Sequence, residues 1–124
     1  MTSGMSSMET KSLDHPDETR PFVGKGRADI VKVGGVTVGR AVFEPGWRWS
    51  EHVKPLAQTE SCQSSHVGYV LSGRMRVRMD DGREAEVGPG EAMAIAPGHD
   101  AWVVGDEACV ALDFSGMEQY AKRS

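Results

Sequence analysis

Residues 66–102 constrain the fold most, because glycine-marked turns divide them into four short apolar segments. In the second segment Met75, Val77 and Met79 alternate with arginines. A period of two residues puts the apolar side chains on one face of a strand and the arginines on the other. This part of the chain therefore predicts short strands rather than helices.

The turn that follows this segment predicts how the strand pairs. A three-residue loop at residues 80–82 would place Gly82 where the backbone needs a positive φ. A two-residue loop would shift the pairing of the two strands and mix the core-facing with the solvent-facing side chains. The alternation therefore favours a three-residue loop. The resulting Arg–Glu pairs are interpreted as solvated surface pairs. In this register the facing residues are Met75 with Val87, Val77 with Ala85, Arg76 with Glu86, and Arg78 with Glu84.

Strand patterns continue on both sides of this region. Residues 28–33 and 36–43 flank Gly34 and Gly35, which is a hairpin signal. Residues 47–54 alternate so that both tryptophans share one face, and we expect a further strand there. No segment keeps a 3.6-residue period, and many short strands predict an all-β sandwich or barrel.

Length and charge limit the classes of protein to which this chain can belong. With 124 residues we expect a flexible N-terminal tail at 1–20, a single domain at 21–116 and a C-terminal tail at 117–124. The net charge of -4 argues against nucleic-acid binding, and no apolar run reaches the roughly 20 residues of a membrane span. Two cysteines and no signal-peptide core predict a cytoplasmic protein. Exposed sheet edges predict a homodimer.

Glycine and histidine spacing adds a family resemblance. Five residues separate Gly46 from His52, six separate His66 from Gly73, and Gly90 precedes the run Ala96-Pro97-Gly98-His99. Over roughly residues 36–114 this pattern resembles the two motifs of the cupin superfamily. The resemblance implies an all-β, cupin-type double-stranded β-helix (jelly-roll) barrel.

The sequence departs from the family's metal-ligand pattern in several places. Lys54 stands where a second histidine is usual, and His66 occupies the slot of the acidic ligand. Ala101 occupies the last histidine slot, while His99 lies two residues earlier. A two-residue shift along a strand keeps the same face, so His99 still points into the barrel.

These positions predict a metal site made of histidines. We expect His52, His66 and His99 to converge at one mouth of the barrel, with Cys62 as a candidate fourth ligand. Neutral imidazoles favour a divalent transition metal, namely zinc, iron, nickel or copper, over magnesium or calcium. Each residue also has a plainer interpretation, because a histidine can serve as a surface residue and a cysteine as a buried apolar one.

The remaining site candidates carry weaker signals. Lys54 is a candidate for binding an anionic substrate, although a solvated edge lysine is the commoner case. Trp102 is a candidate pocket residue or a plain core residue. No motif identifies catalytic residues. Glu51, Glu60 and Tyr69 are the nearest candidates for a general acid or base. Glu51, Glu60 and Asp100 are candidate carboxylates, either as a further metal ligand or as partners that hold a histidine tautomer.

Three classes of function remain open, because the cupin fold does not fix one function. The first is a small metal-dependent enzyme, dioxygenase-like or another oxidoreductase or isomerase, that acts on a small molecule. The alternative is a non-catalytic barrel that binds a small ligand or a metal and reports it to a partner. A third is a structural dimer with vestigial histidines. The sequence does not identify the substrate.

Overall fold

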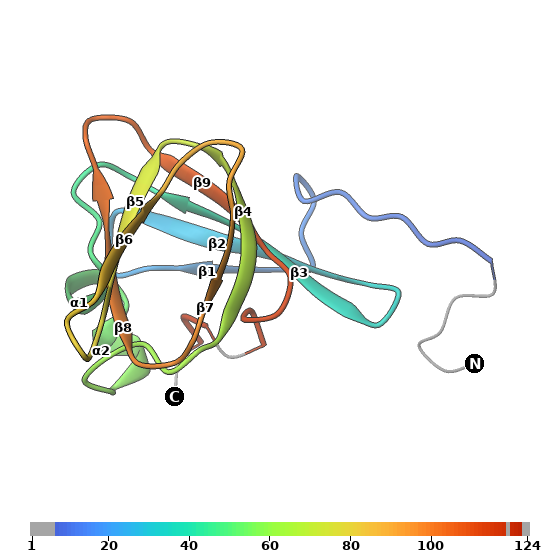
Figure 1. Ribbon diagram of the computed structural model, residues 1–124. Helices are drawn as coiled ribbons and strands as arrows, with labels where there is room; N and C mark the ends of the chain where they lie inside the picture. Colours follow the sequence, from blue (N-terminus) through green and yellow to red (C-terminus); the bar gives the residue numbers. More distant parts are fainter. Residues whose placement is uncertain (1–6, 119, 123–124) are drawn as a thin grey trace.

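A computed structural model of the protein describes residues 7–118 and 120–122 (Figure 1). Strands dominate this part of the chain, and the two helices are one turn long. The elements in chain order are β1 (Glu18–Pro21), β2 (Gly26–Val33), β3 (Val36–Phe43), α1 (Trp49–His52), α2 (Lys54–Ala57), β4 (His66–Ser72), β5 (Arg74–Met79), β6 (Glu84–Val87), β7 (Ala92–Ile95), β8 (His99–Val104) and β9 (Cys109–Asp113).

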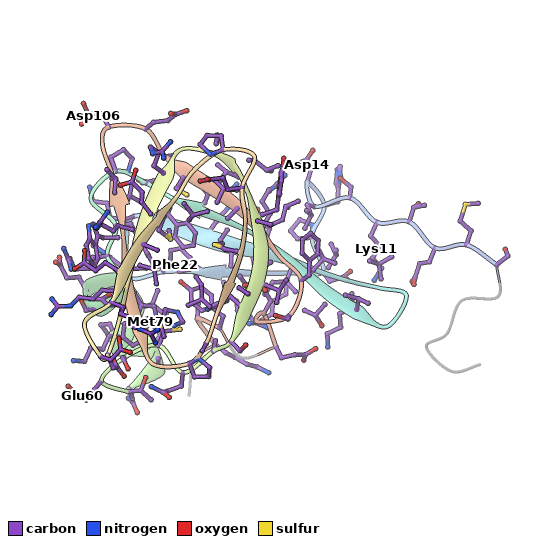
Figure 2. All side chains as sticks on the ribbon, in the orientation of Figure 1. Lys11, Asp14, Phe22, Glu60, Met79 and Asp106 are labelled. Atoms are coloured by element: carbon purple, nitrogen blue, oxygen red, sulfur yellow. The ribbon has the colours of Figure 1, made fainter. Side chains whose placement is uncertain are left out.

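The strands form two antiparallel sheets. The larger has the order β1-β2-β3-β9-β4-β7, and the smaller has the order β6-β5-β8. The hydrophobic core takes buried side chains from both sheets, such as Ile30 and Val70 from the larger and Met75 and Val103 from the smaller. Figure 2 shows side chains filling the space between the sheets, with Phe22 among them and Glu60 at the periphery. The predicted all-β jelly-roll fold is confirmed.

The hairpin of β5 and β6 has the predicted register. Met75 pairs with Val87 and Val77 with Ala85, and the arginines lie opposite Glu86 and Glu84. Gly82 has a φ of 93° and closes the three-residue loop. The cross-strand ion pairs are exposed, since the Arg76 side chain is 39% accessible. The local alternation of apolar and charged residues was therefore sufficient to predict this pairing.

Residues 47–54 were predicted as a strand, and this was wrong. Here only Arg48 makes a strand-like bridge, to Trp102, and the chain then enters α1. The N–H of His52 donates to the carbonyl of Arg48, which is the bond of a helical turn. Both tryptophans are buried at 2% exposure, but Trp47 precedes the helical turn and Trp49 begins it. The two buried tryptophans are two residues apart in the sequence, as in a strand, but the backbone enters a helical turn between them. Their spacing alone was therefore not evidence for a strand.

The packed domain extends beyond the predicted limits of 21 and 116. Strand β1 begins at Glu18 and pairs with β2, and Arg20 is buried at 7% exposure. The Arg20 guanidinium donates to the carbonyls of Met117 and Tyr120 at 2.8 Å each. The side chains of Met117 and Tyr120 are part of the core. The predicted tails also cover residues 1–6, 119 and 123–124, which lie outside the described residues.

No helix within residues 7–118 and 120–122 is both long and apolar enough to cross a membrane.

Candidate metal centre

Cys62, His66 and His99 meet at one end of the two-sheet core. One ligand atom from each lies within 4.8 Å of the other two, and the three residues are 2%, 8% and 3% exposed. The Cys62 Sγ lies 3.7 Å from His66 Nε2. His66 and His99 are the first residues of β4 and β8, while Cys62 lies in the loop before β4. Reciprocal backbone bonds link that loop to β8, with the Cys62 N–H 2.7 Å from the His99 carbonyl.

A buried carboxylate fixes the orientation of His66. Its Nδ1–H donates to Asp113 Oδ2 at 2.5 Å, so Nε2 faces Cys62. The other oxygen of Asp113 accepts from the backbone N–H groups of Ser115, at 2.9 Å, and Gly116, at 2.6 Å. A Cβ at Gly116 would lie 2.4 Å from His66 Nδ1, so this close approach needs a glycine.

His99 is oriented by a backbone carbonyl. Its Nδ1–H donates to the carbonyl oxygen of Ala96 at 2.8 Å, which leaves Nε2 as the ligand atom. The rings of His66 and His99 meet edge to face, with centroids 5.4 Å apart. A metal-binding histidine usually donates its other N–H to a carboxylate or a carbonyl, and both histidines here do so.

The ionisable groups of the cluster shift the pKa values of one another. Burial raises the pKa of the Cys62 thiol, but hydrogen bonds with His66 and His99 outweigh it and bring that pKa to about 6. Burial lowers the pKa of His66, but hydrogen bonds with Asp113 and Cys62 outweigh it and raise that pKa to about 9. Burial alone would raise the pKa of Asp113, yet its bond to His66 holds it below the usual value. Without a metal, the hydrogen bonds of the cluster therefore favour the thiolate form of Cys62 and the protonated form of His66.

His52 lies apart from this cluster. It is half-buried in α1, where its Nδ1 accepts a hydrogen bond from the backbone N–H of Arg48 at 3.1 Å. The helical turn that replaces the expected strand directs this side chain elsewhere. Among the described residues, the structure thus brings together two of the three predicted histidines and the candidate fourth ligand, Cys62.

The other predicted candidates lie outside the cluster as well. The Lys54 ammonium pairs with Glu60, whose side chain is 97% exposed. The Arg48 guanidinium covers the Trp102 ring at 4.4 Å. Asp100 accepts from the Ser50 N–H at 3.1 Å. The side chains of Glu51 and Tyr69 are exposed.

Asp113 was missed by the sequence analysis, although a signal was present. Cys109, Ala111 and Asp113 alternate along β9 and all three are buried. A carboxylate on the inward face of an otherwise apolar strand needs a partner, and this requirement marks it as a candidate for a site.

A chamber of about 50 Å³ adjoins the cluster. Its wall includes His66, His99 and Asp113, and the rest is mostly apolar. A surface cleft of about 350 Å³ reaches Cys62 from outside the core. Tyr120 and Trp49 line both spaces and therefore separate them. The residues that line the chamber are Ala41, Phe43, Trp47, Trp49, His66, Met75, Val77, Met93, Ile95, His99, Ala101, Ala111, Leu112, Asp113, Met117 and Tyr120.

The sequence of this scaffold matches a known family. A family profile described as Cupin domain matches residues 39–115, which include all three ligand candidates and Asp113. The chain belongs to the cupin family. No curated protein matches the sequence.

Solved structures share this cupin fold at low sequence identity. A polyketide cyclase from Streptomyces resistomycificus superimposes with a TM-score of 0.61 and 22% identity, over 90% of this chain and 80% of its own. A variant of oxalate decarboxylase from Bacillus subtilis gives a TM-score of 0.62 and 17% identity, over 99% of this chain and 34% of its own. A protein of unknown function from Rhizobium leguminosarum superimposes with a TM-score of 0.58 and 22% identity, over 89% of this chain and 98% of its own. At these identities the likeness supports the fold and not an activity.

Proposed function

We propose that this cupin is a small metal-dependent enzyme whose Cys62, His66 and His99 hold one divalent transition metal ion. The observation that carries the proposal is the convergence of three buried ligand atoms within 4.8 Å. Asp113 and the Ala96 carbonyl orient the two imidazoles, which is the arrangement expected around ligating histidines.

The donor set decides which metals fit. One thiolate and two imidazoles suit zinc, iron, nickel or copper, whereas magnesium and calcium prefer oxygen ligands. Three protein ligands leave a coordination position for water or substrate. The lowered pKa of Cys62 favours the thiolate that a metal needs. The raised pKa of His66 means that a metal must displace a proton to bind there.

Each group of the site has a separate task in this proposal. A bound metal would supply a Lewis acid that polarises an oxygen of the substrate. Asp113 holds the His66 tautomer whose Nε2 points to the cluster. The apolar chamber excludes bulk water and positions a small molecule beside the ligands. Tyr120 packs edge to face on His66, at 5.2 Å between centroids, and closes the chamber toward the cleft.

The class of reaction is the finer part of the proposal. Two structural neighbours are named as a cyclase and a decarboxylase, so this fold hosts chemistry on small molecules. An oxidoreductase of the dioxygenase type remains the first candidate, and iron in the site would favour it. The second candidate is a non-catalytic barrel that binds a ligand or metal, and turnover measurements separate the two.

Metal content tests the proposal. The protein would be purified without a chelator or a histidine tag, and its metals would be measured by elemental analysis. We expect about one transition metal ion per chain in the wild type, and loss of that ion in His66→Ala and Cys62→Ala. The matched control is His52→Ala, which removes a histidine outside the cluster and should retain the metal. Loss of metal in the His52 variant, or no metal in any protein, would contradict the proposal.

The predicted homodimer stays a prediction. The outer face of β4 carries Val67, Tyr69 and Leu71, which are 49%, 39% and 47% exposed. Neighbouring large apolar side chains of this kind form a surface that a second copy of the chain would bury.

A further inference from the structure

Arg20 is a charged side chain at an inward-facing position of β1. It is 7% exposed and pairs across the sheet with Ala28, which is 0% exposed. The Nη1 group of Arg20 donates to the carbonyl oxygens of Met117 and Tyr120, at 2.8 Å each. Glu18 accepts from Nε–H at 2.9 Å and from Nη2–H at 3.1 Å, and this two-point contact orients the guanidinium. Arg20 is therefore a fixed anchor for residues about a hundred positions away.

The anchored Tyr120 lies on the proposed metal centre. Tyr120 is 5% exposed, and its ring meets His66 edge to face at 5.2 Å between centroids. The ring of Phe22, which directly follows β1, meets the Tyr120 ring at 6.1 Å. Ala121 has a φ of 56°, in the left-handed region that disfavours residues with a Cβ. The contacts with Arg20 and Phe22, and not local backbone preference, therefore hold Tyr120 in place.

Side chains tie this part of the chain to the barrel. Within the part of the chain that the structure describes, no helix or strand continues beyond β9. Residues 117, 118 and 120 are bonded to the barrel through Arg20 and through Thr37, whose hydroxyl donates to Glu118 Oε2 at 2.6 Å. Arg20 is the one of these two that is bonded to Tyr120. Loss of the guanidinium would therefore loosen Tyr120 without removing a metal ligand.

Tyr120 also stands between the metal ligands and the surface cleft. The cleft of about 350 Å³ is lined by Cys62 and Tyr120, and its polar side chains include Thr59, Gln63 and Ser64. The wall of the chamber on the other side is mostly apolar. Taking a cation out of water into apolar surroundings is costly, so the polar cleft is the favoured route for a metal ion. An ion on this route passes the Tyr120 ring.

We propose that Arg20 is a positioning residue of the metal centre and sets the rate of metal exchange through the cleft by holding Tyr120 against His66. This inference rests on the proposed function, because it describes the regulation of the same site. Arg20 acts through Tyr120, since its guanidinium bonds two carbonyls and Glu18 and not a metal ligand. A firm hold on Tyr120 slows exchange and leaves the ligands themselves unchanged.

Zinc release tests this inference. The protein would be loaded with zinc and mixed with an excess of a chromophoric chelator, and the release rate would be followed by absorbance. We expect Arg20→Gln to release zinc roughly tenfold faster than the wild type, because two hydrogen bonds from a charged donor are lost. The zinc dissociation constant should change much less than the rate, since all three ligands remain. Arg20→Lys should restore part of the slow release, because an ammonium group still donates to carbonyls.

A double variant separates positioning from general stability. Tyr120→Leu should release zinc as fast as Arg20→Gln, and adding Arg20→Gln to it should give no further acceleration. An arginine that only stabilised the fold would accelerate release in both backgrounds. Arg27→Gln is the matched control, because the Arg27 side chain lies on neighbouring β2, is 49% exposed and pairs with Asp29. If Arg20→Gln does not fold, Arg20→Lys in the same two backgrounds decides the question.

Three outcomes would overturn the inference. Bound zinc that leaves wild type and Arg20→Gln at the same rate would refute it and leave the proposed function standing. Further acceleration in the double variant would show that Arg20 does not act through Tyr120. A wild type that binds no zinc, iron, nickel or copper would refute this inference and the proposed function together. In metal-free protein, alkylation of Cys62 by iodoacetamide should also quicken in Arg20→Gln and not in Arg27→Gln, and equal rates would contradict the role of Tyr120.

Discussion

The two cysteines show how different two buried places in one barrel can be. Cys62 and Cys109 are 2% and 0% exposed, and neither forms a disulfide. Cys62 lies beside two imidazoles, and its pKa is brought to about 6. Burial raises the pKa of Cys109 to about 11, with a smaller contribution from the charge of Glu107. Burial alone makes a thiol inert, and ionisable partners make it a thiolate.

Strand β9 connects these two environments. It begins at Cys109 among apolar neighbours and ends at Asp113, which binds His66. The same alternation that buries Cys109 and Ala111 therefore delivers a carboxylate to the cluster. The comparison teaches that the chemistry of this barrel is concentrated where inward-facing positions are polar and paired.

Among substitutions outside the three proposed ligands, the largest effect is expected from Asp113→Asn. The substituted amide would present an N–H to His66 Nδ1, which favours the tautomer with its proton on Nε2, the ligand atom. We expect the affinity for zinc to fall about 10- to 100-fold, as measured by competition with a chromophoric chelator. Asp100→Asn is the matched control, because Asp100 is bonded to Ser50 outside the cluster. Equal losses in both variants would contradict the role given to Asp113.

The two thiols should differ in their pH dependence. A thiol reacts as its thiolate, so in metal-free protein the alkylation of Cys62 by iodoacetamide should rise through a midpoint near pH 6. Cys62 is among the residues that line the cleft, which is the route by which the reagent would reach it. Cys109 should stay unreactive through neutral pH, because its pKa is about 11. Mass spectrometry of wild type and Cys62→Ser follows each site, and one common midpoint near the ordinary thiol pKa would refute the difference.

The smallest effect should come from the exposed ion pairs of β5 and β6. The guanidinium of Arg76 lies 2.6 Å from Glu84 and 3.5 Å from Glu86, but water screens all three groups. We expect Arg76→Gln to change the thermal midpoint less than Asp113→Asn does, and to leave metal affinity unchanged. Calorimetry at low and high salt checks this prediction. A fall in the thermal midpoint as large as that of the Asp113 variant would show that exposed charge pairs stabilise this protein as much as the buried pair does.

Local patterns predicted the fold well. The register of β5 and β6 followed from alternation and one glycine, and the β2–β3 hairpin from Gly34 and Gly35, whose φ values are 58° and 79°. These features depend on neighbours in the sequence, so the sequence contains the information. The packing of the two ends of the domain could not be predicted in this way. It depends on the hydrogen bonds of Arg20 to Met117 and Tyr120, which join residues about a hundred positions apart.

The candidate site was predicted only in part. His66 and His99 were named from the cupin resemblance together with the face that each takes on its strand, and the structure brings both into one cluster. His52 depended on a strand that is a helical turn, so its predicted direction does not hold. Asp113 required knowledge of which strand lies beside β4, and that pairing is set by the tertiary fold.

The central claim is that Cys62 and two histidines hold one metal ion, and cobalt substitution tests it most directly. The metal of the wild type would be replaced by Co(II), and the near-ultraviolet spectrum would be compared with those of Cys62→Ser and Cys109→Ser. We predict a sulfur-to-cobalt charge-transfer band in the wild type and in the Cys109 variant, and its loss in the Cys62 variant. A band that survives without Cys62, or no band in the wild type, would contradict the account.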